Sequence, residues 1–204
     1  MAHHYLETVF TPDVQAEQRR YYGRGQVLPP APGPDELGPD EAAFIAGADS
    51  FYLGTVNSDG WPYVQHRGGP RGFLRVFDSR TLAFADLGGN RQIVSTGNLT
   101  ANDRVSVFIM DYPRRQRLKL LGRATVSPAA SEPGLAAELA PPGLAPRLVE
   151  RIYRIAIVGF DWNCPKYITP RFTSAEVEEA VKPLRGRIAA LEGALKSAGL
   201  ALPA

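Results

Sequence analysis

The stretch RVSVFIMDYPRRQRLKLLGRATV, residues 104–126, contains the two clearest strands of the chain. Its halves RVSVFIMD and RLKLLGRATV are rich in β-branched and long apolar residues, and the basic turn YPRRQ separates them. This pattern predicts two antiparallel strands joined by a short loop. In the second strand Arg117 and Lys119 alternate with leucines, so both cations are expected on one face of the sheet.

Similar strand patterns continue on both sides of this pair. They are FYLGTVN and WPYVQHR around Ser58-Asp59-Gly60, Gly72–Phe77 and Thr81–Asp86 around Asp78-Ser79-Arg80, and YRIAIVGF at Tyr153–Phe160. About seven short strands, mostly in hairpins, predict a mainly β, antiparallel fold whose edges close into a barrel. Regular β-α-β alternation and a G-x-G-x-x-G fingerprint are missing from the sequence, which argues against a Rossmann domain.

Helices are predicted mainly outside these strands. Thr11 as N-cap, Pro12 in the first turn and Gly23 as the stop indicate an N-terminal helix. A proline- and glycine-rich arm follows at 28–39, and shorter helices are expected at Asp40–Ala48, at Arg91–Leu99 and within Ser131–Arg151.

A longer helix is predicted near the C-terminus, where Thr173 and Glu176 have the spacing of a capping box. Pro183 lies inside the helical pattern, so a kink or break near Glu179 is expected. The helix carries a short apolar stripe, which favours packing against the core or in a dimer over a free coiled coil. The stripe consists of Leu184, Ile188, Leu191 and Leu195.

The composition is that of a globular protein, with 44% hydrophobic and 22% charged residues among 204. A formal net charge of +2 does not indicate nucleic-acid binding, and the single cysteine, Cys164, excludes an intrachain disulfide. The sequence shows no secretory signal and no apolar run of about 20 residues. We therefore expect a cytoplasmic protein without a nucleic-acid, membrane or metal partner.

The segment WPYVQHRGGPRGFLRV, Trp61–Val76, concentrates arginines around glycines. Guanidinium groups bind phosphate through paired hydrogen bonds, and a glycine pair at a strand end exposes N–H groups to an anion. On a strand, Gln65 and Arg67 share one face while His66 points the other way. The segment therefore predicts a site for a phosphorylated cofactor. The alternatives are a surface ion pair for Arg67 and a surface histidine for His66.

A second group of candidate residues follows the fourth predicted strand, at Asn90, Arg91 and Gln92. They stand at the start of a predicted helix, whose free N–H groups and positive dipole end favour phosphate. An arginine is unfavourable for the helix itself at this end, and such a local conflict is expected at a functional site.

Two further groups complete the candidate site. Arg117 and Lys119 form a pair of cations with few acids nearby in sequence, which predicts a ligand phosphate or the carboxylates of a second chain as their partner. Trp162 and Asn163 end the last strand and suit either the wall of a heterocycle site or the packed core. Cys164 has no histidine placed to activate it, so a packed thiol is expected there. The G-x-S-x-G, P-loop and H-E-x-x-H motifs are missing from the sequence, which suits a protein that holds a cofactor.

Taken in order, five segments resemble the pyridoxamine 5'-phosphate oxidase-like FMN-binding split-barrel family. They are PYVQHRGGPRGFLRV, TLAFADLGGNRQ, GNLTANDRVSVFIMD, RLKLLGRATV and FDWNCPKYI, and the similarity covers roughly Leu37 to Arg171. The resemblance implies a split β-barrel domain at 37–171 with peripheral helices. The caps and the proline-rich arm described above add a helix and arm at 1–36 and a C-terminal helix at 172–204. It also implies a homodimer with two FMN molecules at the subunit interface.

The resemblance assigns roles residue by residue. Gln65, His66, Arg67 and Gly68 would contact the flavin ring and ribityl chain, and Phe84, Ala85 and Asp86 would line the ring. Asn90, Arg91 and Gln92 would bind the phosphate. Arg117 and Lys119 would reach FMN across the interface, and Trp162 and Asn163 would close over the ring.

The sequence departs from the oxidase itself after CPKYITPR, where the long helix replaces the arginine- and histidine-bearing tail that grips the substrate phosphate. Pyridoxamine phosphate is therefore not expected as the substrate, and the scarcity of histidine argues against heme. The resemblance implies an FMN-dependent oxidoreductase with an unidentified substrate and with NAD(P)H as a possible electron donor. The alternatives are a non-catalytic flavin carrier or sensor and a deazaflavin-dependent reductase.

Overall fold

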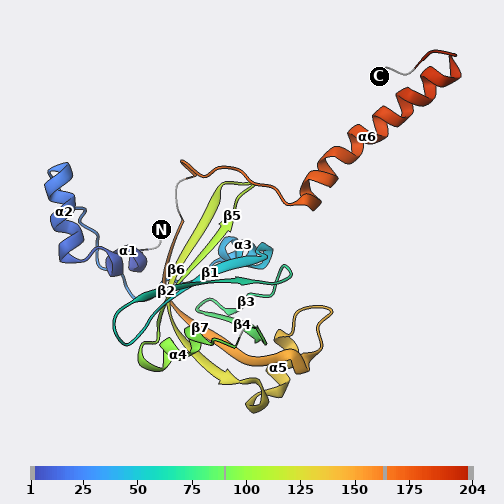
Figure 1. Ribbon diagram of the computed structural model, residues 1–204. Coiled ribbons are helices and arrows are strands. Elements are labelled where there is room, and N and C mark those ends of the chain that lie inside the picture. Colours follow the sequence, from blue (N-terminus) through green and yellow to red (C-terminus); the bar gives the residue numbers. More distant parts are fainter. Residues whose placement is uncertain (1–2, 90, 163–164, 202–204) are drawn as a thin grey trace.

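The computed structural model describes residues 3–89, 91–162 and 165–201. Its centre is a seven-stranded sheet in the order β2-β1-β5-β6-β7-β4-β3, and every neighbouring pair is antiparallel (Figure 1). The strands are β1 (Ser50–Val56), β2 (Pro62–Gly68), β3 (Arg75–Asp78), β4 (Thr81–Leu87), β5 (Arg104–Asp111), β6 (Gln116–Pro128) and β7 (Val149–Trp162). The predicted mainly β split barrel is confirmed. The sheet stays open, because β2 and β3 form its edges.

The two longest strands, β6 and β7, connect the two halves of the sheet. β7 pairs with β6 along most of its length and with β4 over Thr81–Leu87. The β6–β7 register shifts at Gly122, where an added Cβ would lie 2.5 Å from Ile155 Cγ2 and 2.8 Å from the Ala156 carbonyl oxygen. Only glycine fits this close approach, which allows the sheet to bend. β7 begins at Val149, earlier than the predicted Tyr153, because it continues along β4.

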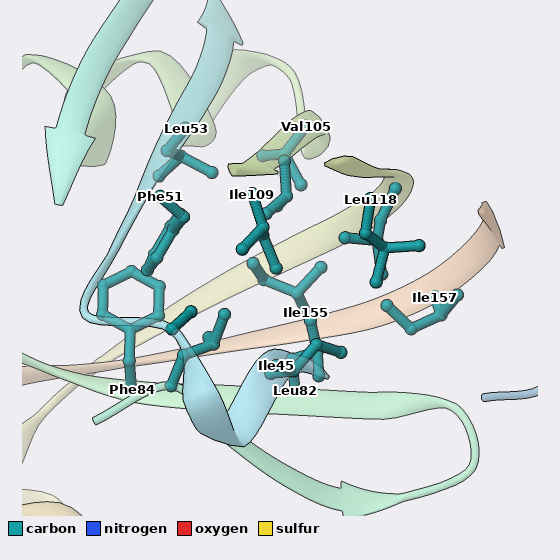
Figure 2. Close-up of a cluster of buried hydrophobic side chains, with 14 of the residues drawn as sticks. Ile45, Phe51, Leu53, Leu82, Phe84, Val105, Ile109, Leu118, Ile155 and Ile157 are labelled. Carbon is teal, nitrogen blue, oxygen red and sulfur yellow. The ribbon is translucent and has the colours of Figure 1, made fainter. Parts of the chain in front are cut away.

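The core lies on the concave side of the sheet and is closed by α3 (Pro39–Gly47), whose Ile45 is fully buried (Figure 2). Strands from both halves contribute to one cluster, which includes Phe51, Leu53, Leu82, Phe84, Ile109, Leu118 and Ile155. The alternation predicted for β6 is confirmed, since Leu118 and Leu120 are buried and Arg117 and Lys119 lie on the opposite face.

Six α-helices are described: α1 (His3–Val9), α2 (Pro12–Tyr22), α3, α4 (Val94–Ala101), α5 (Pro133–Leu139) and α6 (Ser174–Ser197). Two short 3-10 helices, Ala129–Ser131 and Pro146–Leu148, flank α5. The predicted ends of α2 are confirmed, with the Thr11 side chain accepting from the Val14 N–H and Gly23 at φ 74°. The capping box of α6 is also confirmed. A kink or a break was expected near Glu179, and the break is excluded, because α6 runs continuously through Pro183.

Helix α1 was not predicted, because its partners are distant in sequence. The Asp35 carboxylate accepts hydrogen bonds from the backbone N–H groups of His4, Tyr5 and Phe160, at 3.1 to 3.2 Å. The helix passes so close to Gly159 that an added Cβ there would lie 2.6 Å from the Tyr5 nitrogen. Asp35 and Gly159 therefore fix α1 on the outer face of β7.

Candidate functional site

Strand β2 presents the predicted residues on two different faces. Gln65 and Arg67 are half-buried on one face, and His66 is exposed on the other. This confirms the predicted alternation, because successive side chains of a strand point to opposite sides. Gly68 ends the strand opposite Ser50 of β1. The candidate site therefore has an inner part, beneath α4, and an outer part on the open face of the sheet.

The inner part is centred on the buried carboxylate of Asp86. One of its oxygens forms an ion pair with the Arg67 guanidinium, and the other accepts a hydrogen bond from Arg151 Nε at 2.7 Å. Burial disfavours the charged guanidinium of Arg151, but the hydrogen bond and charge of Asp86 outweigh it and raise the Arg151 pKa. Within this chain, the anion beside Arg67 is thus a carboxylate of the protein.

Aromatic rings lie directly beneath Arg67. Its guanidinium carbon lies 5.1 Å from the ring centroid of Tyr153 and 5.6 Å from that of Phe84, and Nη2 donates to the Tyr153 hydroxyl at 3.4 Å. These rings stack on one another within the core. Arg67 Nε is buried without a hydrogen-bond partner among the described residues. Phe84 is therefore a core residue that supports Arg67, and Ala85 lies half-buried beside α5.

Polar side chains attach α4 to three strands. Ser95 Oγ donates to Gln65 Oε1 at 2.7 Å, Asn98 Nδ2 donates to Thr55 Oγ1 at 2.9 Å, and Thr96 Oγ1 lies 2.7 Å from the Tyr153 hydroxyl. These contacts place the loop before α4, which carries the predicted phosphate-binding residues.

In that loop Arg91 has φ 59° and Ile93 has φ 44°, so the helix begins at Val94, later than predicted. The side chains of Arg91 and Gln92 are exposed. Among the described residues, no carboxylate pairs with Arg91. Asn90 lies outside the described residues.

On the outer face, one row of side chains crosses five strands in register. His66, Tyr52, Phe108, Lys119 and Asp161 are successive cross-strand partners. Tyr52 and His66 are in edge contact at 5.6 Å. Lys119 Nζ pairs with Asp161 at 2.9 Å and lies 4.8 Å from the ring centroid of Tyr5. The sequence has few acids close to Lys119, but the fold brings Asp161 of β7 beside it.

Beside this row is a groove of about 600 Å³ with a concentration of aromatic side chains. Its lining includes Tyr52, Phe108 and Tyr112 together with the small residues Gly54 and Ser106, which leave room above the sheet. Arg117 projects into it 5.8 Å from the Phe108 ring centroid, and its Nε is buried without a hydrogen-bond partner among the described residues. Arg171 lines the groove and lies over Tyr112. The groove suits a flat aromatic ligand that carries negative charge.

Trp162 packs against α3 instead of projecting into this groove. Its Nε1 donates to Glu41 at 2.6 Å, and its ring meets Phe44 edge-on at 4.7 Å. This contact supports the alternative reading of Trp162 as a core residue. Asn163 and Cys164 lie outside the described residues.

Several residues of the site could not be found from the sequence. Tyr52 and Phe108 stand on outward positions of their strands, but they become a groove only because β1 and β5 are neighbours. Arg151 joins Asp86 through the β4–β7 register, which no local pattern indicates. The sequence offered one signal for the groove, which is that Tyr52 and Phe108 are aromatic residues at outward-facing positions of their strands.

A family model described as Pyridoxamine 5'-phosphate oxidase matches residues 37–149, more than half of the chain. No curated protein matches it. Solved structures of similar shape include HupZ from Group A Streptococcus, at 12% identity over 67% of this chain and 99% of that chain, with a TM-score of 0.48. General Stress Protein 26 from Bacillus anthracis is 17% identical over 64% and 92%, with a TM-score of 0.46.

A third structure is HutZ, the heme storage protein from Vibrio cholerae, at 16% identity over 62% of this chain and 94% of that chain, with a TM-score of 0.41. In the part of the chain that the structure describes, no helix is long and apolar enough to cross a membrane. The five ordered segments, the open antiparallel sheet and the match over residues 37–149 agree. The chain belongs to the pyridoxamine 5'-phosphate oxidase family.

Proposed function

We propose that the chain is an FMN-binding flavoprotein with oxidoreductase activity on a substrate still to be identified. The observation that carries this proposal is Arg117, whose buried Nε has no described partner and faces an aromatic groove. A buried donor without a partner is costly, and a ligand acceptor would satisfy it.

The residues present suit both chemical parts of FMN, the flavin ring and the phosphate. The flavin ring is flat and largely apolar, which suits the aromatic residues of the groove. The phosphate needs hydrogen-bond donors and positive charge, and Arg91 offers an exposed guanidinium in the loop before α4. Gln65, Arg67 and Asp86 would support that loop, because Gln65 holds Ser95 of α4.

The proposal includes a homodimer with the cofactor at its interface. The outer faces of β1 and β2 expose Tyr52 and Val64, and Trp61 beside them is 73% exposed. Contiguous apolar surface of this kind marks protein interfaces. In a dimer, the loop of one chain and the groove of the other would together form one site.

When bound, FMN would supply electron or hydride transfer at its ring. The residues of this chain would bind and orient it. Arg91 and Arg117 would hold negative charge, and the Tyr52–Phe108 surface would keep water from one side of the ring. The Asp86 ion-pair cluster would hold Arg67 in place.

The visible spectrum of the purified protein tests this function. We expect the absorption bands of an oxidised flavin, which NADH or NADPH bleaches and an electron acceptor restores. A yellow protein that neither donor reduces would be a carrier or sensor. A colourless protein that binds a deazaflavin would be a deazaflavin-dependent reductase. A Soret band, or binding of neither flavin nor deazaflavin, would overturn the proposal.

A further inference from the structure

Helix α6, residues Ser174–Ser197, extends away from the sheet and packs against no part of it (Figure 1). It contains no buried residue, and Leu184 and Ile188 are 63% and 55% exposed. Its contact with the rest of the chain is at the first turn, where Glu176 lies 3.7 Å from Arg71. Packing on the core, one of the two alternatives from the sequence, is therefore not what the structure shows.

The sequence of α6 is poorly suited to a helix that stands alone in water. Pro183 removes a backbone hydrogen bond, and Gly186 and Gly193 lower helix propensity further. Most helical stability in proteins comes from packing of an apolar face. A helix with these residues therefore needs a partner along its length.

The apolar residues of α6 repeat with the spacing of a coiled coil. Val177, Val181, Leu184, Ile188, Leu191 and Leu195 are separated alternately by four and three residues. This order gives Val181, Ile188 and Leu195 at a positions and Val177, Leu184 and Leu191 at d positions. β-Branched residues at a with leucine at d favour two parallel strands. Pro183, Gly186 and Gly193 fall at c and f positions, away from the seam.

The charges beside the seam are complementary between two copies. Arg187 is at a g position and Glu192 at the following e position, and these two positions face each other across a parallel, in-register pair. Neither residue has an ion-pair partner among the described residues, whereas Arg185 already pairs with Glu178 of its own helix. In an antiparallel pair g faces g and e faces e, so these opposite charges would not meet.

We propose that α6 pairs with α6 of a second copy of this chain as a parallel, in-register, two-stranded coiled coil. The seam residues are Val177, Val181, Leu184, Ile188, Leu191 and Leu195. Each Arg187 pairs with Glu192 of the other copy. This surface is separate from the outer face of the sheet and does not depend on flavin binding.

The first test measures amide hydrogen exchange of α6 in the full chain. We expect residues 177–195 to be protected in the parent. In the double variant Ile188→Asp with Leu191→Asp, the protection of α6 against hydrogen exchange should fall at least tenfold, because two charges enter the seam. The control Ala189→Asp with Ala190→Asp adds the same charges on the outer face of the same turn and should keep it. Equal protection in the two variants would overturn the proposal.

The second test determines orientation and register by cross-linking. In a Cys164→Ser background, Ala198→Cys introduces a thiol at the next d position and should give a disulfide-linked dimer on mild oxidation. Ser197→Cys, at the adjacent c position, is the matched control and should cross-link far less. Equal yields at the two positions would contradict a parallel, in-register pair.

Charge reversal examines the Arg187–Glu192 pairing itself. Arg187→Glu and Glu192→Arg should each weaken α6 protection, and the double variant should restore it. Failure of the double variant to recover would contradict this pairing. A protein that binds neither flavin nor deazaflavin but still cross-links through Ala198→Cys would refute the flavin proposal and leave the coiled coil intact. A yellow protein that fails to cross-link would refute the coiled coil and leave the flavin proposal intact.

Discussion

At the scale of single residues, the Arg67–Asp86–Arg151 cluster shows how far local sequence patterns reach. Strand alternation predicted that Arg67 and Gln65 share a face, and they do. The anion beside Arg67 is Asp86, which is 19 residues away in the sequence. The second arginine at this carboxylate, Arg151, is 65 residues from Asp86. Such partners follow from the strand order, which local patterns do not specify.

We expect Asp86→Asn to destabilise the fold by about 3 kcal/mol, because two half-buried guanidinium groups would lose their shared carboxylate. The control Asp103→Asn breaks the exposed pair with Arg123 and should cost less than about 1 kcal/mol. Urea unfolding of the two variants measures both values. If both variants lost a similar free energy of unfolding, burial of the Asp86 cluster would add nothing to its contribution to stability.

Arg91→Ala should weaken FMN retention, because a charge-assisted phosphate contact contributes about 1.5–3 kcal/mol, or roughly 10- to 150-fold in Kd. Flavin fluorescence titration of the apoprotein measures the change. Arg104→Ala removes an exposed arginine from the start of β5 and serves as the control. Unchanged affinity in Arg91→Ala would remove this residue from the phosphate site.

Stability should fall at acid pH partly through Glu132. Hydrogen bonds from Arg154 and Ser127 lower the pKa of its carboxyl in the folded chain. The unfolded chain then binds the proton more readily, so the contribution is complete above about pH 4.5 and is lost as pH falls through the folded pKa. The melting temperature of Glu132→Gln, recorded from pH 7 to pH 3, should depend less on pH than that of the parent. Glu138→Gln, at an exposed carboxylate near Arg75, should keep the parental slope.

At the scale of elements, the sequence predicted those whose signals are local. Caps defined α2 and α6, and the hairpins β1–β2 and β5–β6 followed from alternation and turns. The beginning of α4 was missed, because Arg91 and Ile93 adopt positive φ values that their residue types do not indicate. Helix α1 was missed because Asp35 and Gly159 determine its position.

Gly159→Ala should release α1 from β7, because the new Cβ would collide with backbone atoms of Tyr5. Limited proteolysis and hydrogen exchange of residues 3–9 should both show increased exposure. Gly54→Ala is the matched control: Gly54 lies on β1, and a Cβ there makes an ordinary 3.4 Å contact with Ser106. If α1 stayed protected in Gly159→Ala, the close approach would not be what holds the helix.

At the scale of the whole molecule, the split barrel followed from the count of strands and from the ordered segments that resemble the family. A closed barrel was the simpler expectation from hairpins alone. The edges remain open because β2 and β3 stand at opposite ends of the strand order, and both halves meet on β6 and β7. The groove could not be predicted, because its lining residues come from four strands, β1, β2, β5 and β6, and from the segment at 167–171.

Val64→Asp should separate the proposed sheet interface while the chain stays folded. Val64 is 64% exposed on the edge strand β2, so a carboxylate there is solvated in a single chain and unfavourable in an apolar interface. Light scattering should show weaker association and the flavin should be lost, with near-UV circular dichroism unchanged. Val27→Asp, on the exposed N-terminal arm, should alter none of these. Full flavin retention in Val64→Asp would place the cofactor elsewhere.

The position of β7 also bears on how the chain acquires its fold during synthesis. β4 and β6 both leave the ribosome before β7, and each has β7 as its eventual neighbour. Until residues 149–162 emerge, β3–β4 and β5–β6 are hairpins whose inner edges have unpaired N–H and C=O groups. Translation at about 5–20 residues per second leaves these edges open for seconds. The nascent chain is therefore most prone to wrong strand pairing in that interval, when a chaperone that covers strand edges would improve its yield most.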